Sequence, residues 1–548
     1  MSHFPKSASG NISHADVALA AYDRQCAAGI RSHTVLTDTL KGAVESAWLQ
    51  CAQMLVLRSD AQAALAVLEV AFAHFEASSE VRLALAGIVF RQGARDRAES
   101  LLCRVLEDDP GHLAATLQLA RLLKEQGRMQ AVATVVRSGF RRDRHDAELV
   151  IHGVELLDDC GRKHEAAALC EHEIAAGSSD PRLHAYAGML LSQLGQFELA
   201  RVRQEYVLDH DLRGLEWHVP LGLTGLQRYT DRNHPDFARL HEYLSLPGLS
   251  EQARASLLFG LGKAHDDIGD YARAASYLRQ ANATVHASTR WPRKRWRRSV
   301  EAKISQSLPA GQLAATVDWT PVFIVGLPRS GTTLLADRLA RHPDVCQRGE
   351  LPWLPVVAEQ VINGNGNYRE RLQHAAATYT AQLLQDDSSA LWLIDKQPHN
   401  FMHVDLILAL FPNARFLYCR RHARDNALSL WMQSFQAGAQ DFAYDFTDIS
   451  AVIQGSRRLM NHWLTRYPDA IRIVQYEHLV SDPVCLLRGV ADWLGLPSHD
   501  LVSNTPDKDS IISTASLWQA RQPIHTRSLR RWEHYSAYVP ELLQLPDH

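Results

Sequence analysis

The 548-residue sequence lacks the marks of a membrane protein and of a disulfide-rich domain. No apolar run approaches the roughly 18 residues that a membrane-spanning helix needs. The first ten residues, MSHFPKSASG, contain no apolar signal core, so we expect a cytoplasmic protein without a membrane span. The 8 cysteines are scattered and form no C-x-x-C pair. This spacing argues against a metal site and against a disulfide framework.

An excess of charge of either sign is also lacking. The chain has 58 Lys and Arg against 61 Asp and Glu, a formal net charge of -3, which gives it no bias toward nucleic acid. Hydrophobic residues make up 46% of the chain and charged residues 22%, as in folded globular proteins. A chain of this length and composition is expected to hold several folded domains.

A small residue recurs every 34 residues in the first half of the chain. The recurring glycines are Gly93, Gly127, Gly161 and Gly195, an Ala or Val follows five positions after each, and the same phase reaches back to Ser59 and Ala64. Apolar residues between these positions follow helical spacing. This pattern is typical of the tetratricopeptide repeat, in which neighbouring helix pairs bury each other's apolar faces. We predict an all-α repeat domain over residues 1–284, a scaffold of a type that commonly holds a protein or peptide.

The repeat period breaks once. Gly262, Gly269 and Ala274 fit the same pattern, but Gly269 lies 74 residues after Gly195, which is not a multiple of the period. Residues 210–250 are therefore predicted to contain an insertion or a degenerate helix pair.

Residues 285–319 are predicted to form a basic linker. Residues 290–298 contain six Arg or Lys and two Trp. Two interpretations stay open: a solvated linker or a helix that packs back on the scaffold, and a surface that steers an acidic substrate.

Short apolar runs alternate with helical stretches from Pro321 onward. The expected strands are 322–325, 391–394, 415–419 and 471–474. Such alternation favours a parallel sheet with helices on both faces, so we predict an α/β domain of the P-loop type over residues 320–548.

Residues 326–333, GLPRSGTT, follow the first of these strands and begin a helix. Backbone N–H groups of such a turn bind phosphate. The common nucleotide loop reads G-x-x-x-x-G-K-S/T, but here Thr332 stands in place of the lysine and Arg329 lies inside the loop. No acidic residue ends a later strand, since 415–419 continues into Arg420 and Arg421. These features argue against Mg²⁺-dependent phosphoryl transfer and indicate a phosphate loop that works without a metal.

The motif resembles the 5′-phosphosulfate loop of the sulfotransferases that use 3′-phosphoadenosine 5′-phosphosulfate (PAPS). It is most similar to that of the tyrosylprotein sulfotransferases and of bacterial proteins that join tetratricopeptide repeats to such a domain. The resemblance covers about residues 320–535. It implies PAPS as co-substrate, no metal, and transfer of a sulfuryl group to an acceptor hydroxyl. The phosphosulfate would lie on Arg329, Ser330, Gly331, Thr332 and Thr333.

The resemblance also implies roles for residues elsewhere in the domain. Arg421 and Ser429 match the pair that binds the 3′-phosphate, and a guanidinium with a hydroxyl suits that group. Tyr476 matches a tyrosine at the nucleotide. Ser528 and Arg531 match the segment that closes over PAPS.

The catalytic residues implied by the resemblance are Arg329, Glu350 and Lys396. Glu350 matches the general base, which takes the proton of the acceptor hydroxyl. Lys396 matches the lysine at the bridging oxygen, on which charge builds as the S–O bond breaks. His399 ranks second as a base, because the histidine that cytosolic small-molecule sulfotransferases use two positions after their lysine is Pro398 here.

The acceptor stays open. The tyrosylprotein enzymes follow their lysine with Asp-Pro, whereas this chain has Gln397-Pro398. The repeats favour a protein or peptide, and so tyrosine, slightly over a carbohydrate or a small molecule. Two alternatives are an ATP-dependent P-loop phosphotransferase and a non-catalytic repeat scaffold with a degenerate nucleotide-binding domain.

Overall fold

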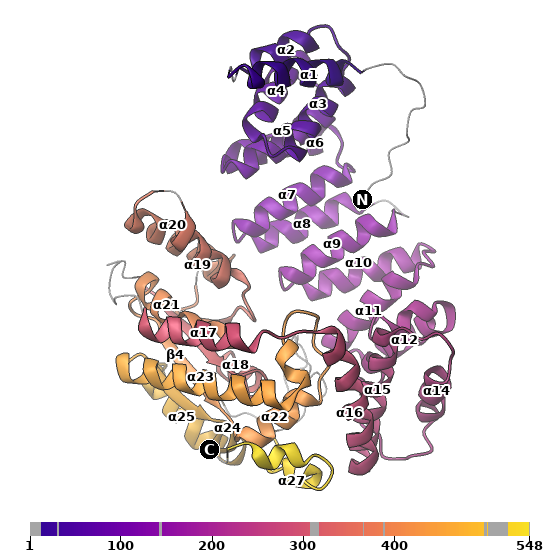
Figure 1. The fold of residues 1–548 in the computed structure, drawn as a ribbon, viewed down its shortest axis with the longest axis vertical. Coiled ribbons are helices and arrows are strands. Elements are labelled where there is room, and N and C mark those ends of the chain that lie inside the picture. The colour runs from indigo at the N-terminus through magenta and orange to yellow at the C-terminus, as the bar shows by residue number, and fades with distance from the viewer. Residues whose placement is uncertain are drawn as a thin grey trace. The chain divides into compact units, whose positions relative to one another are not determined.

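A computed structural model describes residues 13–29, 32–141, 145–306, 317–364, 366–386, 389–497, 501 and 524–546 (Figure 1). The chain forms two compact units, Met1–Cys160 and Gly161–His548. The predicted boundaries at residues 284 and 319 remain predictions. Over the described residues, no helix has both the length and the apolarity needed to cross a membrane.

Helices alone build the first unit and the beginning of the second. The first unit contains α1 His14–Ala27, α2 Thr34–Leu40, α3 Glu45–Leu57, α4 Ala61–His74, α5 Ser79–Arg91, α6 Arg95–Asp108, α7 Leu113–Glu125, α8 Met129–Gly139 and α9 Ala147–Asp159. The second begins with α10 Lys163–Ala175, α11 Pro181–Gln193, α12 Phe197–His210, η1 Leu212–Leu215, α13 Val219–Gly225, α14 Pro235–Leu244, α15 Glu251–Asp267 and α16 Tyr271–Ser288. The irregular residues 210–250 thus contain η1 and the short helices α13 and α14, each of which packs against α15.

The recurring glycines lie in the tight turns between paired helices. Gly93, Gly127, Gly161, Gly195 and Gly269 have φ between 72° and 87°, a left-handed conformation that costs glycine little. Ser59 has the same conformation at φ 61°, in the turn between α3 and α4. The small side chains five residues later are fully buried. The predicted all-α repeat architecture is confirmed.

The basic run forms a helix that packs on the α/β domain. It begins α17 Arg293–Ser305, which lies beside α23 Phe446–Arg466. The indole Nε1 of Trp296 donates to the carbonyl oxygen of Ala451 at 3.1 Å, and Arg293 pairs with Asp448. The interpretation of this run as a helix was therefore right. The helix was expected to pack on the repeat scaffold, but it packs on α23 of the α/β domain. The two tryptophans of the run explain this placement, because their indole rings pack against the apolar core of the α/β domain.

Five parallel strands form the sheet of the second unit, in the order β2-β3-β1-β4-β5. They are β1 Thr320–Gly326, β2 Val345–Gln347, β3 Trp392–Asp395, β4 Arg415–Arg420 and β5 Ile471–Gln475. The four predicted strands are present, and the predicted parallel α/β fold is confirmed. The strand that was not predicted, β2, has three residues, too few for a sequence pattern.

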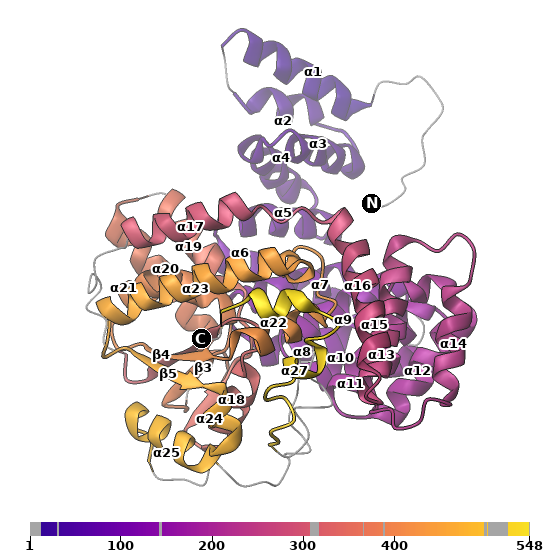
Figure 2. The same ribbon diagram turned by 60° about the horizontal axis from the view of Figure 1, so that its bottom comes forward.

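Helices cover both faces of this sheet (Figure 2). Val322 and Ile324 point to one face and pack with α18 Thr332–Leu339, α24 Tyr476–Ser481 and α25 Pro483–Leu494. Phe323 and Val325 point to the other, because successive side chains of a strand alternate. The helices on that side are α19 Trp353–Asn363, α20 Tyr368–Leu384, α21 Val404–Leu410, α22 Ala423–Trp431 and α23. Burial on both faces explains why β1, the middle strand, is an unbroken apolar run from Val322 to Val325.

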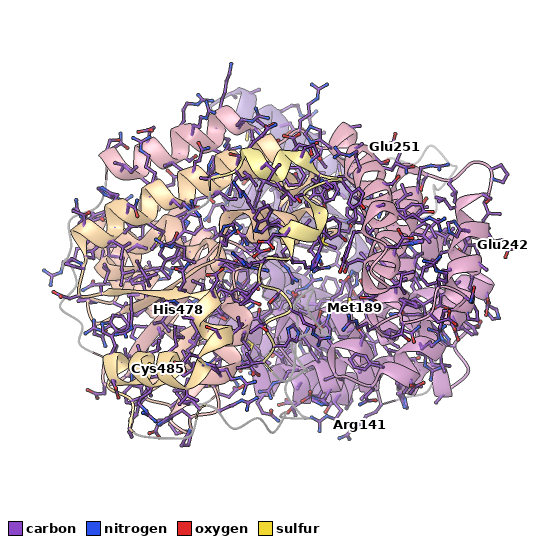
Figure 3. All side chains as sticks on the ribbon, turned by 90° about the horizontal axis from the view of Figure 1, so that it is seen from below. Arg141, Met189, Glu242, Glu251, His478 and Cys485 are labelled. Carbon is purple, nitrogen blue, oxygen red and sulfur yellow. The ribbon has the colours of Figure 1, made fainter. Side chains whose placement is uncertain are left out.

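The chain ends with the short elements α27 Trp532–Tyr535 and η4 Pro540–Gln544, and η2 Pro398–His403 and η3 Asp441–Tyr444 lie earlier in the domain. Within the part of the chain that the structure describes, the eight cysteines form no disulfide. Cys485, labelled on α25 in Figure 3, is exposed.

Candidate active site

The candidate residues gather at one edge of the sheet. All five strands are parallel, so their carboxyl ends meet at this edge, which is where α/β sheets bind ligands. The phosphate loop follows β1 and Lys396 follows β3. Arg421 follows β4 and Tyr476 follows β5. Glu350 lies three residues beyond β2.

The phosphate loop has an unusual backbone. Gly331, at φ 96°, is the N-cap residue before α18, and no side chain of the described residues caps this helix, so its first N–H groups suit an anionic ligand. A side chain at this position would collide with the ring of Tyr476. Arg329 adopts φ 68°, a left-handed conformation that is strained for arginine and typical of functional loops. Asn426 supports the loop from α22, since its Nδ2 donates to the carbonyl oxygen of Pro328 at 2.9 Å.

Arg421 is held by three neighbours. Its Nη1 donates to the carbonyl oxygen of Arg329 at 2.8 Å, and its Nη2 donates to that of Ser528 at 3.0 Å. Its Cζ lies 4.6 Å from the ring centre of Tyr476, a cation–π contact. Its Nε is buried and has no hydrogen-bond partner among the described residues. Arg329 in turn donates from Nε to the Oγ of Ser429 at 3.2 Å, so both predicted 3′-phosphate residues lie beside the loop.

Three arginines, Arg329, Arg421 and Arg531, act on one another through their charges here. Burial, together with the like charges of Arg421 and Arg531, lowers the pKa of Arg329 to about 10. Arginines that repel each other in a partly buried site favour an anionic ligand, and the unpartnered Nε of Arg421 leaves a donor for it. The residues present therefore fit a phosphate-bearing nucleotide. Within the described ranges, no group of three or more His, Cys, Asp or Glu is arranged to hold a metal ion.

A C-terminal segment, residues 527–535, lies against these arginines. The hydroxyls of Tyr476 and Ser528 are hydrogen-bonded at 2.6 Å. The buried carboxylate of Asp425 on α22 accepts the backbone N–H groups of Arg530 at 2.8 Å and of Trp532 at 3.0 Å. The sequence analysis missed Asp425, because an acid inside a helix carries no signal of what it contacts.

Glu350 and Lys396 form an ion pair, although they are 46 residues apart in the chain. The side chain of Lys396 is 6% exposed and that of Glu350 is 45% exposed, so the pair stands at the boundary between core and solvent. The Nε2 of His399 lies 2.9 Å from the Oε1 of Gln440, an amide oxygen that accepts its N–H. Burial lowers the pKa of His399, while Gln440 and the charge of Glu350 oppose that shift. The lowered pKa favours the neutral form of the His399 imidazole.

A fully buried carboxylate joins the segments that carry this pair. Asp395 accepts the N–H of Leu351, next to Glu350, at 3.3 Å, and that of Gln397, next to Lys396, at 2.9 Å. The Nδ2 of Asn400 donates to it at 2.7 Å, and so does the hydroxyl of Tyr379. The expectation that no acidic residue ends a later strand is therefore wrong, because Asp395 is the last residue of β3. Its carboxylate is buried and accepts hydrogen bonds from these four protein groups, which the sequence did not reveal.

Asp395 should make stability depend on pH. Burial raises its pKa from 3.8 to about 6, and the four hydrogen bonds oppose that shift. A raised folded-state pKa gives stability that is present below pH 4 and is lost as pH rises through 6, by about 3 kcal/mol. We expect the free energy of unfolding of the wild type, minus that of Asp395→Asn, to fall by this order between pH 4 and 6. Urea denaturation at a series of pH values measures it, and a difference that stays flat would contradict the assignment.

Comparison with known proteins agrees with this geometry. Residues 321–500 match the model of the sulfotransferase family, and residues 90–151 match that of the tetratricopeptide repeat. The chain is 30% identical over 327 residues to a protein of Aquifex aeolicus (strain VF5) described as "Uncharacterized protein". That match covers 56% of this chain and 43% of the relative, so this chain spans less than half of its length.

Two further proteins are more distant. "Protein-tyrosine sulfotransferase 1" of Danio rerio is 25% identical over 235 residues, which are 39% of this chain and 66% of the relative. Among solved structures, the sulfotransferase domain of the Synechococcus PCC 7002 olefin synthase is 22% identical, with a TM-score of 0.32 over 41% of this chain and 91% of that one. The family matches and the architecture together support a fusion of tetratricopeptide repeats with a domain that matches the sulfotransferase family.

Proposed function

We propose that this protein transfers a sulfuryl group from PAPS to an acceptor hydroxyl. The observation that carries the proposal is the cationic cluster beside the phosphate loop, in which Arg421 keeps a buried donor without a partner. A loop that has Thr332 in place of the lysine, with arginines around it, suits a nucleotide with two phosphate-bearing ends.

The two ends of the donor have separate proposed sites. The 5′-phosphosulfate would lie on residues 329–333, against the N–H groups at the start of α18. The 3′-phosphate would lie between Arg421 and Ser429, where Arg421 is already oriented by the carbonyl oxygens of Arg329 and Ser528. Tyr476, Ser528 and Arg531 would complete the nucleotide site.

Transfer would proceed in line. The acceptor oxygen bonds to sulfur while the bond from sulfur to the bridging oxygen breaks, and the acceptor proton passes to Glu350. The ion pair with Lys396 supports this role, since it places the Glu350 carboxylate beside the lysine proposed to act on the leaving oxygen. The leaving nucleotide gains the negative charge, which Arg329 and Lys396 would stabilise. Much of the acceleration would come from holding the reactants in position.

For the acceptor, we propose tyrosine in a protein or peptide. The exposed Glu350 is open to a large acceptor, and repeat arrays of this type bind extended chains. The name of the Danio rerio relative points to the same acceptor. Screening tyrosine peptides against sugars and phenols, with radiolabelled PAPS, would separate the acceptor classes.

Calorimetric titration tests the donor site before any acceptor is known. Purified protein is titrated in EDTA with 3′-phosphoadenosine 5′-phosphate (PAP), the product nucleotide, and with ATP and AMP as controls. We expect PAP to bind without metal at a micromolar or lower Kd, and AMP to bind about 100-fold more weakly for want of the 3′-phosphate. Binding of ATP only with Mg²⁺ would indicate a phosphotransferase instead. A protein that binds none of these nucleotides would be a repeat scaffold.

A further inference from the structure

The last helix pair of the repeat region, α15 and α16, contacts the segment that borders the donor site. Asp266, near the end of α15, pairs with Arg531 and accepts the hydroxyl of Tyr535 at 2.6 Å. On α16, the ring of Tyr271 stacks on His534 with 4.9 Å between ring centres. The repeat helices thus reach residues 531–535 directly.

Arg531 needs a counter-ion in this position. Arg531 lies three residues after Ser528, whose carbonyl oxygen accepts from Arg421, and its charge helps to lower the pKa of Arg329. Like charges in a partly buried site repel each other. The side chains of Arg531 and Asp266 are 24% and 11% exposed, so water screens their attraction only in part. Asp266 is the acid that holds Arg531 among the other arginines.

The same segment also orients the donor residues. Ser528 accepts from Arg421 through its carbonyl oxygen and contacts Tyr476 through its hydroxyl. Between Ser528 and Arg531 the backbone turns through Arg530 at φ 54°, a strained conformation that persists only where its surroundings impose it. The contacts that impose it are Asp425 on α22, which holds the backbone, and Asp266 on α15, which holds the next side chain.

We propose that Asp266 is a positioning residue of the donor site, so that the last repeat helix pair is a working part of that site as well as a scaffold. This inference rests on the proposed function. Asp266 acts through Arg531 and the backbone of the C-terminal segment, which set the position of Ser528 and, through its carbonyl oxygen, of Arg421.

The direction in which Asp266→Asn changes PAP affinity separates a positioning role from a simple charge effect. Asp266→Asn removes a negative charge near an anion site, so electrostatics alone predicts tighter PAP binding. Loss of positioning predicts the opposite, and we expect PAP to bind about 10-fold more weakly. The matched control is Glu541→Gln, which removes one negative charge from the same repeat-facing surface by breaking the pair with Arg279 and leaves residues 527–535 untouched. PAP affinity of that variant should be unchanged or slightly higher.

Calorimetry on the full chain, with thermal unfolding of each variant, decides the outcome. In an Arg531→Ala background, Asp266→Asn should have little further effect, because the two residues act as a unit. Tyr535→Phe is a milder variant for the case in which Asp266→Asn unfolds. It removes the hydroxyl that donates to Asp266 but keeps the charge of Asp266. We expect it to weaken PAP binding by about 2-fold or more. A wild type that does not bind PAP refutes the proposed function. A wild type that binds PAP, with Asp266→Asn and Tyr535→Phe binding as tightly or more tightly, overturns the positioning role alone.

Discussion

Arg421→Ala is expected to weaken PAP binding by about 100- to 1000-fold, the cost of removing a charge-assisted contact from a partly buried site. AMP, which has no 3′-phosphate, should lose far less affinity, so the preference for PAP over AMP should largely disappear. The structural reason is that the Arg421 guanidinium is already fixed by two carbonyl oxygens while its Nε keeps a buried donor. Isothermal titration of both nucleotides measures the effect.

The neighbouring arginine provides a matched control. Arg420 has the same side chain one residue earlier, but it is exposed and donates to Gln475 at 3.2 Å. Arg420→Ala should keep PAP affinity within about 3-fold, the scale of a screened surface charge. Equal losses in the two variants would mean that general positive charge, rather than a defined 3′-phosphate site, binds the nucleotide.

Glu350→Gln is expected to lower the rate of sulfuryl transfer by about 100- to 10 000-fold, the usual contribution of a general base. The amide keeps the shape of the side chain and a carbonyl oxygen that can accept from Lys396, but it cannot take a proton. PAP affinity should stay near that of the wild type, because Glu350 follows β2 while Arg421 and Ser429 belong to the other side of β1. Transfer from radiolabelled PAPS to an acceptor that the wild type modifies, beginning with tyrosine peptides, gives the rate.

An exposed acid on the next helix serves as the comparison for that rate. Glu359 lies on α19, nine residues further along, and Glu359→Gln should leave transfer close to the wild-type rate. A Glu350→Gln protein that retains most of its activity would remove Glu350 as the base. His399, whose lowered pKa favours its neutral form, would then be the residue to replace next.

The sequence predicted the parts of this protein whose signals are local. Each repeat glycine lies in a left-handed turn within its own helix pair, so the 34-residue period is visible in the sequence. The same period placed Ser59 in such a turn. The phosphate loop is likewise one continuous segment, and its Arg329 and Thr332 are visible without any contact. Glu350, Lys396, Arg421, Ser429 and Tyr476 were found through family resemblance, and the parallel sheet explains why they share an edge.

Local sequence carried no sign of the buried acids that connect these segments. Asp395 joins the segments of Glu350 and Lys396, Asp425 holds the C-terminal segment, and Asp266 brings a repeat helix to it. Each of these contacts spans tens to hundreds of residues, and the spacing along the chain does not record it. The sequence by itself determined the repeats, the α/β class and the phosphate loop, because short-range periodicity and turn chemistry encode them. Only the tertiary structure decided which charges meet, since that depends on the packing of distant helices against the sheet.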